Sequence, residues 1–263
     1  MEVYSTGKAY EHVEIMLNSL YENDPRYQNT VFILGYNVIK GGFDYIKSLY
    51  PTNEIITMQL EQMYKGSMWV TKDNIEFLQK SNQVWDYDAS NIEFLYETFK
   101  IRCKFVPMQF VPELNKLPLL DKDEHDIDIL FYGSFNERRN HIIDTVEKAL
   151  PEANIVVTDS LWDDELDEHI QRAKIVLNLH YFIGSRQEQV RLFYLMSNHK
   201  CIISEKSQRN YYQKGIIEST PQNIARACSD ILNSGTWYKF AKSSVRSLIL
   251  SNEYYTKMNG RTQ

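Results

Sequence analysis

Short apolar runs of strand length alternate with amphipathic stretches of helix length along the chain, and this alternation constrains the fold more than any other feature. Apolar runs of this kind are typical of strands buried on both faces of a sheet, and the stretches between them are long enough for crossover helices. The pattern therefore predicts an α/β fold, with parallel strands covered by helices on both faces.

In the first half of the chain, we predict one doubly wound domain over residues 1–112. The expected strands are residues 2–5, 30–36, 54–58, 83–86 and 103–106, and the expected helices are 10–21, 43–50, 72–80 and 91–99. The segment 106–126 holds three of the seven prolines of the chain and ends in a run of charges, which neither a helix nor a central strand tolerates. It predicts a linker at 113–126.

The alternation restarts after this linker and predicts a second doubly wound domain at 127–250, followed by a tail at 251–263. The expected strands are 127–134, 154–160, 174–182 and 200–205, and the expected helices are 136–150, 163–173, 186–198, 221–233 and 237–250. Two Rossmann-like domains of this kind would face a central cleft. Open α/β sheets bind their ligands at the carboxyl ends of their strands, so functional residues are expected in the turns after strands.

Composition narrows the class of protein. The chain is 43% hydrophobic, which excludes disorder, and its net charge of −6 is not that of a dedicated nucleic-acid binder. Cys103, Cys201 and Cys228 stand apart without CxxC spacing and are expected to be reduced core residues. The sequence shows no standard secretion signal and no apolar segment of membrane-spanning length. We therefore expect a cytoplasmic protein without a membrane span.

The segment FYGSFNERRN follows the strand at 127–134 and offers groups that suit a diphosphate. A turn at Gly133 and Ser134 lets the backbone approach a ligand, and the next helix presents unpaired N–H groups. Arg138 and Arg139 add fork-shaped donors for phosphate oxygens. Such turns are common, however, and an arginine pair in a first helical turn is often only solvated.

The segment RQEQVRLFYLMSN places Glu188 and Arg191 beside a helix face that later carries apolar residues. The pair could simply be an ordinary i, i+3 surface pair at a helix start. The first turn of a helix after a central strand opens on the ligand edge of the sheet, however, so a carboxylate there can hold ribose hydroxyls and a guanidinium can hold a pyrophosphate. His180 and Tyr181, at the end of the preceding strand, could reach the same phosphates.

These motifs resemble the nucleotide-binding domain of GT-B glycosyltransferases. The likeness covers residues 127–207 through YGSFNERR, VVTDS, IVLNLHYF and EQVRLFYLMSNHKCIISE. It implies two Rossmann-like domains and a UDP-sugar or related nucleotide-sugar donor held by Gly133, Ser134, Arg138 or Arg139, and Arg191. It implies neither a resident cofactor nor a divalent metal.

A more distant likeness is to the DNA β-glucosyltransferase of T-even phages, which has a Gly-Gly-Ser-Phe turn and a nearby arginine pair. In that enzyme an arginine precedes a ribose-binding glutamate by three residues. Arg191 matches the arginine, but Tyr194 stands where the glutamate is expected. Either Glu188 takes the ribose here or ribose recognition differs.

The resemblance implies transfer of a sugar to an acceptor hydroxyl, and inverting members need a base from the first domain. We predict Glu61 for this role because it follows a strand end, with Asp86, Asp88 and His12 as alternatives. Asp88 is equally expected as a helix N-cap and His12 as an ordinary helix residue.

The acceptor is either a glycan or polysaccharide precursor or a hydroxylated base in phage DNA. The acidic balance disfavours DNA, unless a basic rim forms in the first domain from residues such as Lys8, Lys40, Lys65, Arg102 and Lys104. A non-catalytic module that binds a nucleotide or scaffolds a partner is the alternative function.

Overall fold

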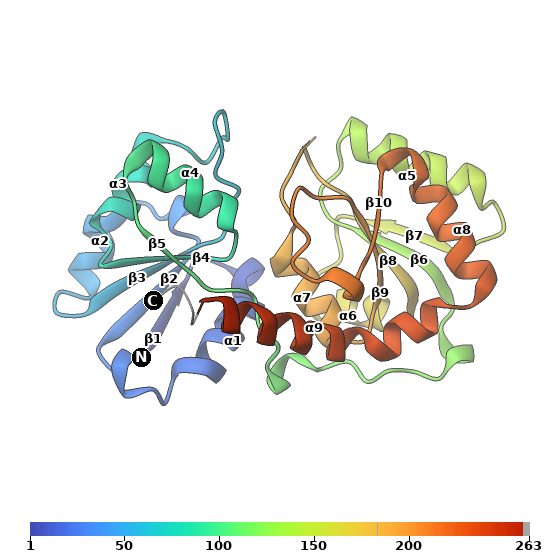
Figure 1. The fold of residues 1–263 in the computed structure, drawn as a ribbon, viewed down its shortest axis with the longest axis horizontal. Coiled ribbons are helices and arrows are strands. Elements are labelled where there is room, and N and C mark those ends of the chain that lie inside the picture. Colours follow the sequence, from blue (N-terminus) through green and yellow to red (C-terminus); the bar gives the residue numbers. More distant parts are fainter. Residues whose placement is uncertain (183, 260–263) are drawn as a thin grey trace. The chain divides into compact units, whose positions relative to one another are not determined.

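The computed structural model describes residues 1–182 and 184–259 (Figure 1). They divide into two compact units: the first comprises Met1–Glu113 together with residues 258–259, and the second comprises Leu114–Lys257. Each unit contains a sheet of five strands, and every strand pair is parallel. Helices connect the strands in both units. The predicted α/β class is therefore confirmed.

The first unit follows the predicted alternation of strands and helices. Its elements are β1 (Glu2–Ser5), α1 (Glu11–Tyr21), β2 (Thr30–Leu34), α2 (Gly42–Leu49), β3 (Glu54–Gln59), α3 (Lys72–Lys80), β4 (Gln83–Asp86), α4 (Ala89–Phe99) and β5 (Cys103–Phe105). The strands lie in the order β1-β2-β3-β4-β5, so each strand pairs with the next one along the chain.

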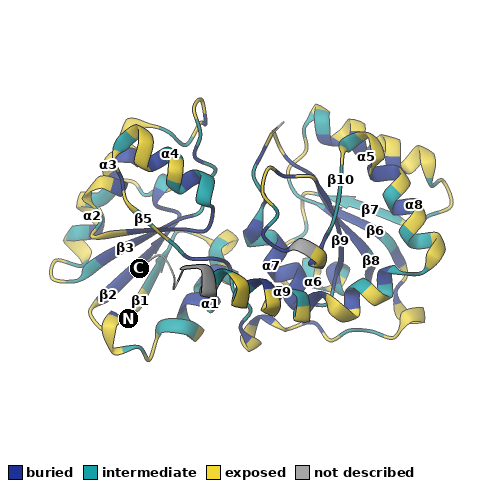
Figure 2. Cartoon of the chain, viewed as in Figure 1, coloured by how far each residue is buried: buried dark blue, intermediate teal, exposed yellow. Residues whose placement is uncertain are grey.

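The strand β2 shows why its apolar run is continuous. Val31 and Ile33 pack in a core with side chains of α2, α3 and α4. Phe32 points to the other face, where its ring lies 6.1 Å from that of Tyr21 in α1 and 5.0 Å from that of Trp85. Full burial of such a side chain contributes about 1.5–3 kcal/mol, so both faces favour apolar residues. All five residues of β2 are accordingly buried (Figure 2).

The second unit has more elements and a different strand order. It contains β6 (Ile127–Tyr132), α5 (Glu137–Ala149), β7 (Ile155–Thr158), α6 (Asp163–Arg172), β8 (Ala173–Asn178), α7 (Gln189–Ser197), β9 (Cys201–Glu205), β10 (Ile217–Ser219), α8 (Ile224–Ser234) and α9 (Trp237–Asn259). The order across the sheet is β10-β9-β8-β6-β7.

This order places a topological switch point between β6 and β8. From β6 the chain moves outward to β7, and it then returns to the other side of β6, where β8, β9 and β10 follow in turn. Ile129 of β6 therefore pairs with Ile155 on one side and Ile175 on the other. In sheets of this kind, ligands usually bind at the carboxyl ends of the two strands on either side of the switch point.

The closing helix is longer than predicted. We expected it to end at residue 250 and to be followed by a tail, but α9 continues to Asn259. No glycine or proline interrupts residues 237–259, and the ring of Tyr255 packs 5.4 Å from that of Tyr211. Packing of this side chain extends the helix. Residues 260–263 of the predicted tail lie outside the described residues.

The three cysteines are free, and Cys201 and Cys228 are buried in the second unit as expected. Within residues 1–182 and 184–259, no helix combines the length and apolar character needed to cross a membrane. Over the same described ranges, no group of three His, Cys, Asp or Glu side chains is placed to hold a metal ion.

Candidate functional site

The turn after β6 lies at the switch point and begins with Gly133. Its backbone nitrogen donates to the carbonyl oxygen of Thr158 at 2.9 Å, and its φ of +123° lies in the region that favours glycine. A Cβ atom at this position would lie 2.8 Å from Nη2 of Arg191. Both the backbone and the neighbouring guanidinium group therefore require glycine here.

Arg191 comes from the first turn of α7, and its guanidinium carbon lies 4.6 Å from the ring centre of Tyr132. The distance from its Nη1 to Oε2 of Glu188 is 3.8 Å, which is too long for a hydrogen bond. This Nη1 is buried and has no hydrogen-bond partner in the described part of the chain. An unsatisfied buried donor costs about 1–3 kcal/mol, and more when it is charged. An anionic ligand would remove this cost.

Arg139 was predicted as a phosphate donor, but its guanidinium group is directed at the protein. The residue is only 3% exposed, and it donates to the carbonyl oxygens of Ser134 at 2.8 Å and Leu179 at 2.6 Å. Its Nη2 also lies 3.4 Å from Oε1 of Glu188. Burial lowers its pKa, although Glu188 opposes this effect. The hydrogen bonds of Arg139 therefore connect the turn after β6 to the end of β8, and its contact with Glu188 orients that carboxylate.

Arg138 forms a separate ion pair with Glu205, the last residue of β9. Its two terminal nitrogens each contact one carboxylate oxygen of Glu205, and Nη1 also donates to the carbonyl oxygen of His180 at 2.8 Å. The same carboxylate accepts from the backbone nitrogen of His180 at 2.6 Å. Glu205 is 2% exposed. It holds α5, β8 and β9 together at the carboxyl edge of the sheet.

The sequence alone predicted no role for Glu205. The sequence feature that could have indicated it is the Ser-Glu pair at the end of β9, which is part of the segment that resembles GT-B enzymes. A carboxylate buried at a strand end needs compensating donors, and Arg138 provides them from a different helix. The partnership spans 67 residues of sequence, so spacing along the chain did not indicate it.

His180 and Tyr181 follow β8, as predicted, but differ in exposure. The His180 ring is buried, its Nε2 lies 3.2 Å from Oγ of Ser207, and burial lowers its pKa. Tyr181 is 38% exposed, and its ring centre lies 5.2 Å from the guanidinium carbon of Arg139. Ser134 is exposed on the turn. Tyr181 and Ser134 are thus accessible to a ligand, whereas the His180 ring is enclosed.

Tyr194, which stands where the phage enzyme has its ribose-binding glutamate, does not face this edge. It is 2% exposed, and its hydroxyl donates to Oδ1 of Asp167 at 2.5 Å. Glu188, immediately before α7, is instead the carboxylate that contacts Arg139 and lies near Arg191. Glu188, and not Tyr194, therefore places a carboxylate at this edge of the sheet.

Glu61 lies in the first unit, just after β3. Its Oε1 is 3.5 Å from the hydroxyl of Tyr10 and 3.4 Å from Nδ2 of Asn37. Burial raises its pKa, and the two hydrogen bonds oppose this effect. A partly buried carboxylate with a raised pKa is a common feature of functional sites.

The alternatives to Glu61 have structural partners. Asp86 is 0% exposed and accepts from the backbone nitrogen of Asp88 at 2.7 Å. Asp88 is the N-cap of α4, where it accepts from the backbone nitrogens of Ser90 and Asn91. His12 lies partly exposed on α1. Asp86 has no access to a ligand, and Asp88 has the capping role that was the alternative expectation.

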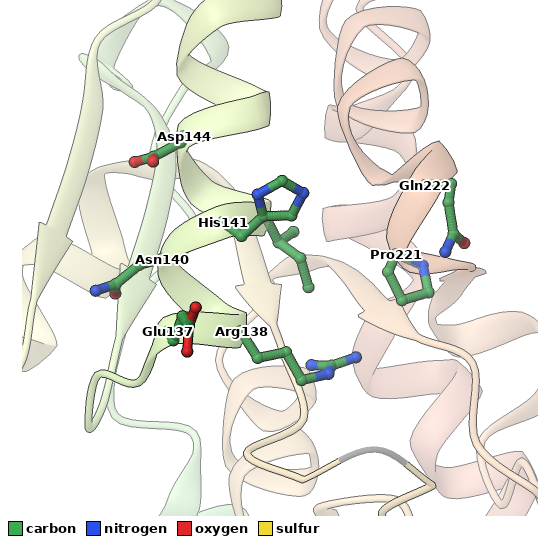
Figure 3. Close-up of a pocket in the computed structure, with 8 residues that line it drawn as sticks. Glu137, Arg138, Asn140, His141, Asp144, Pro221 and Gln222 are labelled. Atoms are coloured by element: carbon green, nitrogen blue, oxygen red, sulfur yellow. The ribbon is translucent and has the colours of Figure 1, made fainter.

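A pocket of about 950 Å³ lies in the second unit between the first two turns of α5 and the short 3-10 helix Pro221–Asn223 (Figure 3). Its lining carries charges of both signs, Glu137, Arg138 and Asp144 among them. Within the described residues, no side chain that lines it has a buried polar atom without a partner. We therefore place the candidate site at the carboxyl edge of β6 and β8, where Arg191 has such an atom.

No family model and no curated protein matches this sequence. Solved structures do match its fold. TarM aligns with 90% of this chain and 56% of its own at 10% identity, with a TM-score of 0.56. HepE from Anabaena, in complex with UDP and glucose, aligns over 88% and 77% of the two chains at 8% identity, with a TM-score of 0.58.

A third solved structure is a UDP-forming α,α-trehalose-phosphate synthase from Burkholderia xenovorans. It aligns over 92% of this chain and 75% of its own at 6% identity, with a TM-score of 0.55. This chain thus spans little more than half the length of TarM and about three quarters of the other two. At such low identity the likeness concerns the fold, and it shows that this chain has the GT-B fold of two Rossmann-like units.

Proposed function

We propose that this protein is a glycosyltransferase that takes a sugar from a nucleotide diphosphate donor, with UDP as the nucleotide. The observation that carries the proposal is the buried Nη1 of Arg191, which has no hydrogen-bond partner in the described residues and lies beside the Gly133 turn at a switch point. A guanidinium group in this position matches the geometry of a pyrophosphate. HepE, whose fold is similar, binds UDP, and this favours a uridine nucleotide.

In this proposal, charged side chains held in place by the protein bind the donor and stabilise the leaving group. Arg191 contacts the diphosphate, and its positive charge stabilises the negative charge that grows on the leaving group as the sugar departs. Glu188 accepts hydrogen bonds from the ribose hydroxyls, and Arg139 holds it in place. Arg138 holds the loop after β8 through His180 and Glu205. The proposed roles of Arg138 and Arg139 are thus to position the site rather than to bind phosphate.

For the acceptor, we propose a hydroxyl group of a glycan or polysaccharide precursor. The net charge of −6 opposes binding to a DNA backbone. Of the possible basic rim, Lys104 is engaged with the face of Trp85 at 4.1 Å. Free cysteines and a nucleotide-sugar donor fit the proposed cytoplasmic location. A hydroxylated DNA base remains the acceptor to compare in the same assays.

Calorimetry with UDP and a screen for UDP release test the proposal. We expect UDP to bind more tightly than ADP, and one donor among UDP-glucose, UDP-galactose and UDP-N-acetylglucosamine to release UDP slowly in water. UDP binding without release from any donor would instead support the non-catalytic nucleotide-binding module. Absence of UDP binding would overturn the proposed function.

Replacing Gly133 by alanine is expected to weaken UDP binding about 10-fold, the equivalent of about 1.4 kcal/mol. The new methyl group would displace Nη2 of Arg191, and alanine disfavours the backbone φ of +123°. Calorimetry measures the affinity. Gly235→Ala is the matched control, because Gly235 also has a positive φ, +65°, but lies at the end of α8. It should lower thermal stability alone; equal losses of affinity in the two variants would contradict the placement of the site.

A further inference from the structure

The last helix of the second unit, α9, buries one face and exposes the other (Figure 2). Residues three and four apart share a face of a helix, and the buried positions follow this spacing. They are Trp237, Ala241, Ser244, Leu248 and Ser251. Oγ of Ser244 also donates to the carbonyl oxygen of Met196 in α7 at 3.1 Å. This face attaches α9 to the rest of the second unit.

The opposite face begins with three exposed basic residues, Lys239, Lys242 and Arg246, which we call the basic group. They follow the same spacing of three and four residues. Nζ of Lys242 lies over the ring of Tyr238 at 4.4 Å. Within residues 1–182 and 184–259, no carboxylate forms an ion pair with the basic group. Its positive charge is therefore available to an anionic partner.

The charge of α9 has the opposite sign to that of the whole chain. Residues 237–259 contain four basic residues and one acidic residue, Glu253, whereas the chain has a net charge of −6. Attraction to a charged surface depends on the charges within about one Debye length, which is about 8 Å at physiological ionic strength. The exposed face of α9 can therefore attract an anionic surface although the protein as a whole is acidic.

Three apolar side chains continue the same face after the basic group. Ile249, Leu250 and Tyr254, the apolar group, are 38%, 54% and 47% exposed. The core takes only Leu248 from the run Leu248-Ile249-Leu250, because Leu248 alone lies on the buried face and is 0% exposed. Single exposed apolar residues are common, but three neighbours next to a basic group form one continuous surface. It suits a partner that offers both anionic groups and an apolar layer.

We propose that the exposed face of α9 binds the surface of an anionic phospholipid membrane. The basic group contacts the anionic headgroups, and Ile249 and Leu250 enter the boundary between headgroups and acyl chains. Tyr254 lies at the level of the headgroups, where tyrosine is favoured. The helix lies along the membrane and does not cross it, consistent with its sequence. The inference goes beyond the proposed function and uses none of the residues of the candidate donor site.

Two other occupants fit this face less well. In a two-fold pairing with a second copy, the basic half of one helix would meet the apolar half of the other, and burying unpaired charges against apolar side chains is costly. A nucleic-acid backbone would contact the basic group but leave Ile249 and Leu250 in water. An anionic bilayer is the partner that matches both groups.

Flotation of the full chain with lipid vesicles tests the inference. The probes are phosphatidylcholine vesicles alone and mixed vesicles that contain about one third phosphatidylglycerol, an anionic lipid. We expect the protein to bind the mixed vesicles about 100-fold more tightly, because each basic residue near such a surface contributes about 5-fold. This preference should disappear in about 1 M salt, where the Debye length is only about 3 Å.

Two variants of α9 separate charge from insertion. Replacing all three residues of the basic group by glutamine should remove the preference for mixed vesicles, a loss of about 100-fold in affinity. Ile249→Ser together with Leu250→Ser should weaken binding to mixed vesicles by about 10-fold or more, since two aliphatic side chains no longer leave water. Because all five positions are exposed, both variants should keep the wild-type thermal transition and UDP affinity.

Each variant has a matched control elsewhere on the surface. The charge control removes three basic residues from exposed positions outside α9, as Lys100→Gln, Arg102→Gln and Lys148→Gln. The insertion control is Leu49→Ser, because Leu49 at the end of α2 is 46% exposed. Both controls should bind mixed vesicles within about 2-fold of the wild type, since charges beyond a Debye length from the contact are largely screened.

The inference is wrong if the wild type binds neither kind of vesicle, or if it binds both equally. It is also wrong if the charge variant binds mixed vesicles like the wild type. Analytical ultracentrifugation without vesicles checks the second-copy alternative: a dimer that the Ile249→Ser and Leu250→Ser variant no longer forms would overturn the membrane assignment. Failure of the proposed function has a different signature, because a protein that binds mixed vesicles but not UDP would leave this inference intact.

Discussion

Replacing Arg191 by alanine is expected to weaken UDP binding by about 100-fold, which corresponds to about 2.7 kcal/mol. The proposed contact is a charge-assisted hydrogen bond to the diphosphate, and such bonds contribute about 1.5–3 kcal/mol. The guanidinium group already lies over the Tyr132 ring, so little rotamer freedom is lost on binding. Calorimetric titration with UDP measures the effect.

Two further variants make the Arg191 result specific. Arg191→Lys keeps the charge but not the planar fork, so an intermediate loss of about 10-fold is expected. Arg246→Ala removes an arginine from an exposed position of α9, and it should bind UDP like the wild type. The Arg191→Ala protein must also retain its thermal unfolding transition, because its guanidinium group contacts Tyr132. If a folded Arg191→Ala protein bound UDP with wild-type affinity, the assignment of the donor site would be wrong.

The sequence was sufficient to predict the α/β fold because the physical cause of each strand is local. A strand covered on both faces must be apolar at successive positions, as Val31, Phe32 and Ile33 are, and this signal needs no knowledge of partners. The length of α9 was not predictable in this way. It depends on the packing of Tyr255 against Tyr211, a contact between residues distant in sequence.

The candidate site was predicted in part. Gly133, Glu188 and Arg191 lie together, because the turns after neighbouring parallel strands meet at one edge of a sheet. The different roles of Arg138 and Arg139 could not be predicted, since adjacent residues at the start of a helix point in different directions. Arg139 turns inward to carbonyl oxygens, whereas Arg138 reaches Glu205.

In the first unit, the sequence pointed to Glu61 through its place after a strand, but gave no sign of the groups that hold it. Gln59 and Asn91 are ordinary polar residues in the sequence, and only their complete burial shows that their amides serve the backbone of Glu61. A pattern along the chain cannot distinguish a buried amide with partners from a solvated one. The sequence alone therefore does not show which residues of neighbouring strands and loops are hydrogen-bonded to each other.

Replacing Lys200 by methionine is expected to stabilise the second unit by about 3 kcal/mol at neutral pH. Lys200 is 2% exposed, and its ammonium group donates to the carbonyl oxygen of Gln171 at 2.8 Å. Burial lowers its pKa from 10.5 to about 7, which corresponds to a cost of about 5 kcal/mol at about 1.4 kcal/mol per tenfold change. Loss of the hydrogen bond and imperfect packing of methionine offset about 2 kcal/mol of the gain.

The pH dependence of this gain identifies its cause. Below pH 7 lysine is charged in both the native and unfolded states, so the full cost of burial applies. Between about pH 7 and 10.5 the unfolded chain binds more protons than the native protein, so wild-type stability rises with pH. The advantage of Lys200→Met should therefore shrink by about 2–3 kcal/mol between pH 7 and pH 9, as measured by urea unfolding at both values.

The exposed Lys148 in α5 supplies the matched control: Lys148→Met should change stability by less than about 0.5 kcal/mol at either pH. Lys200 directly precedes β9 and thus lies at the amino edge of its sheet, whereas Arg191 and Gly133 lie at the carboxyl edge. UDP affinity should consequently be the same in Lys200→Met and in the wild type. If the gain were equal at both pH values, the buried charge would not be its source, and if stability fell, the bond to Gln171 would outweigh the cost of burying the ammonium group.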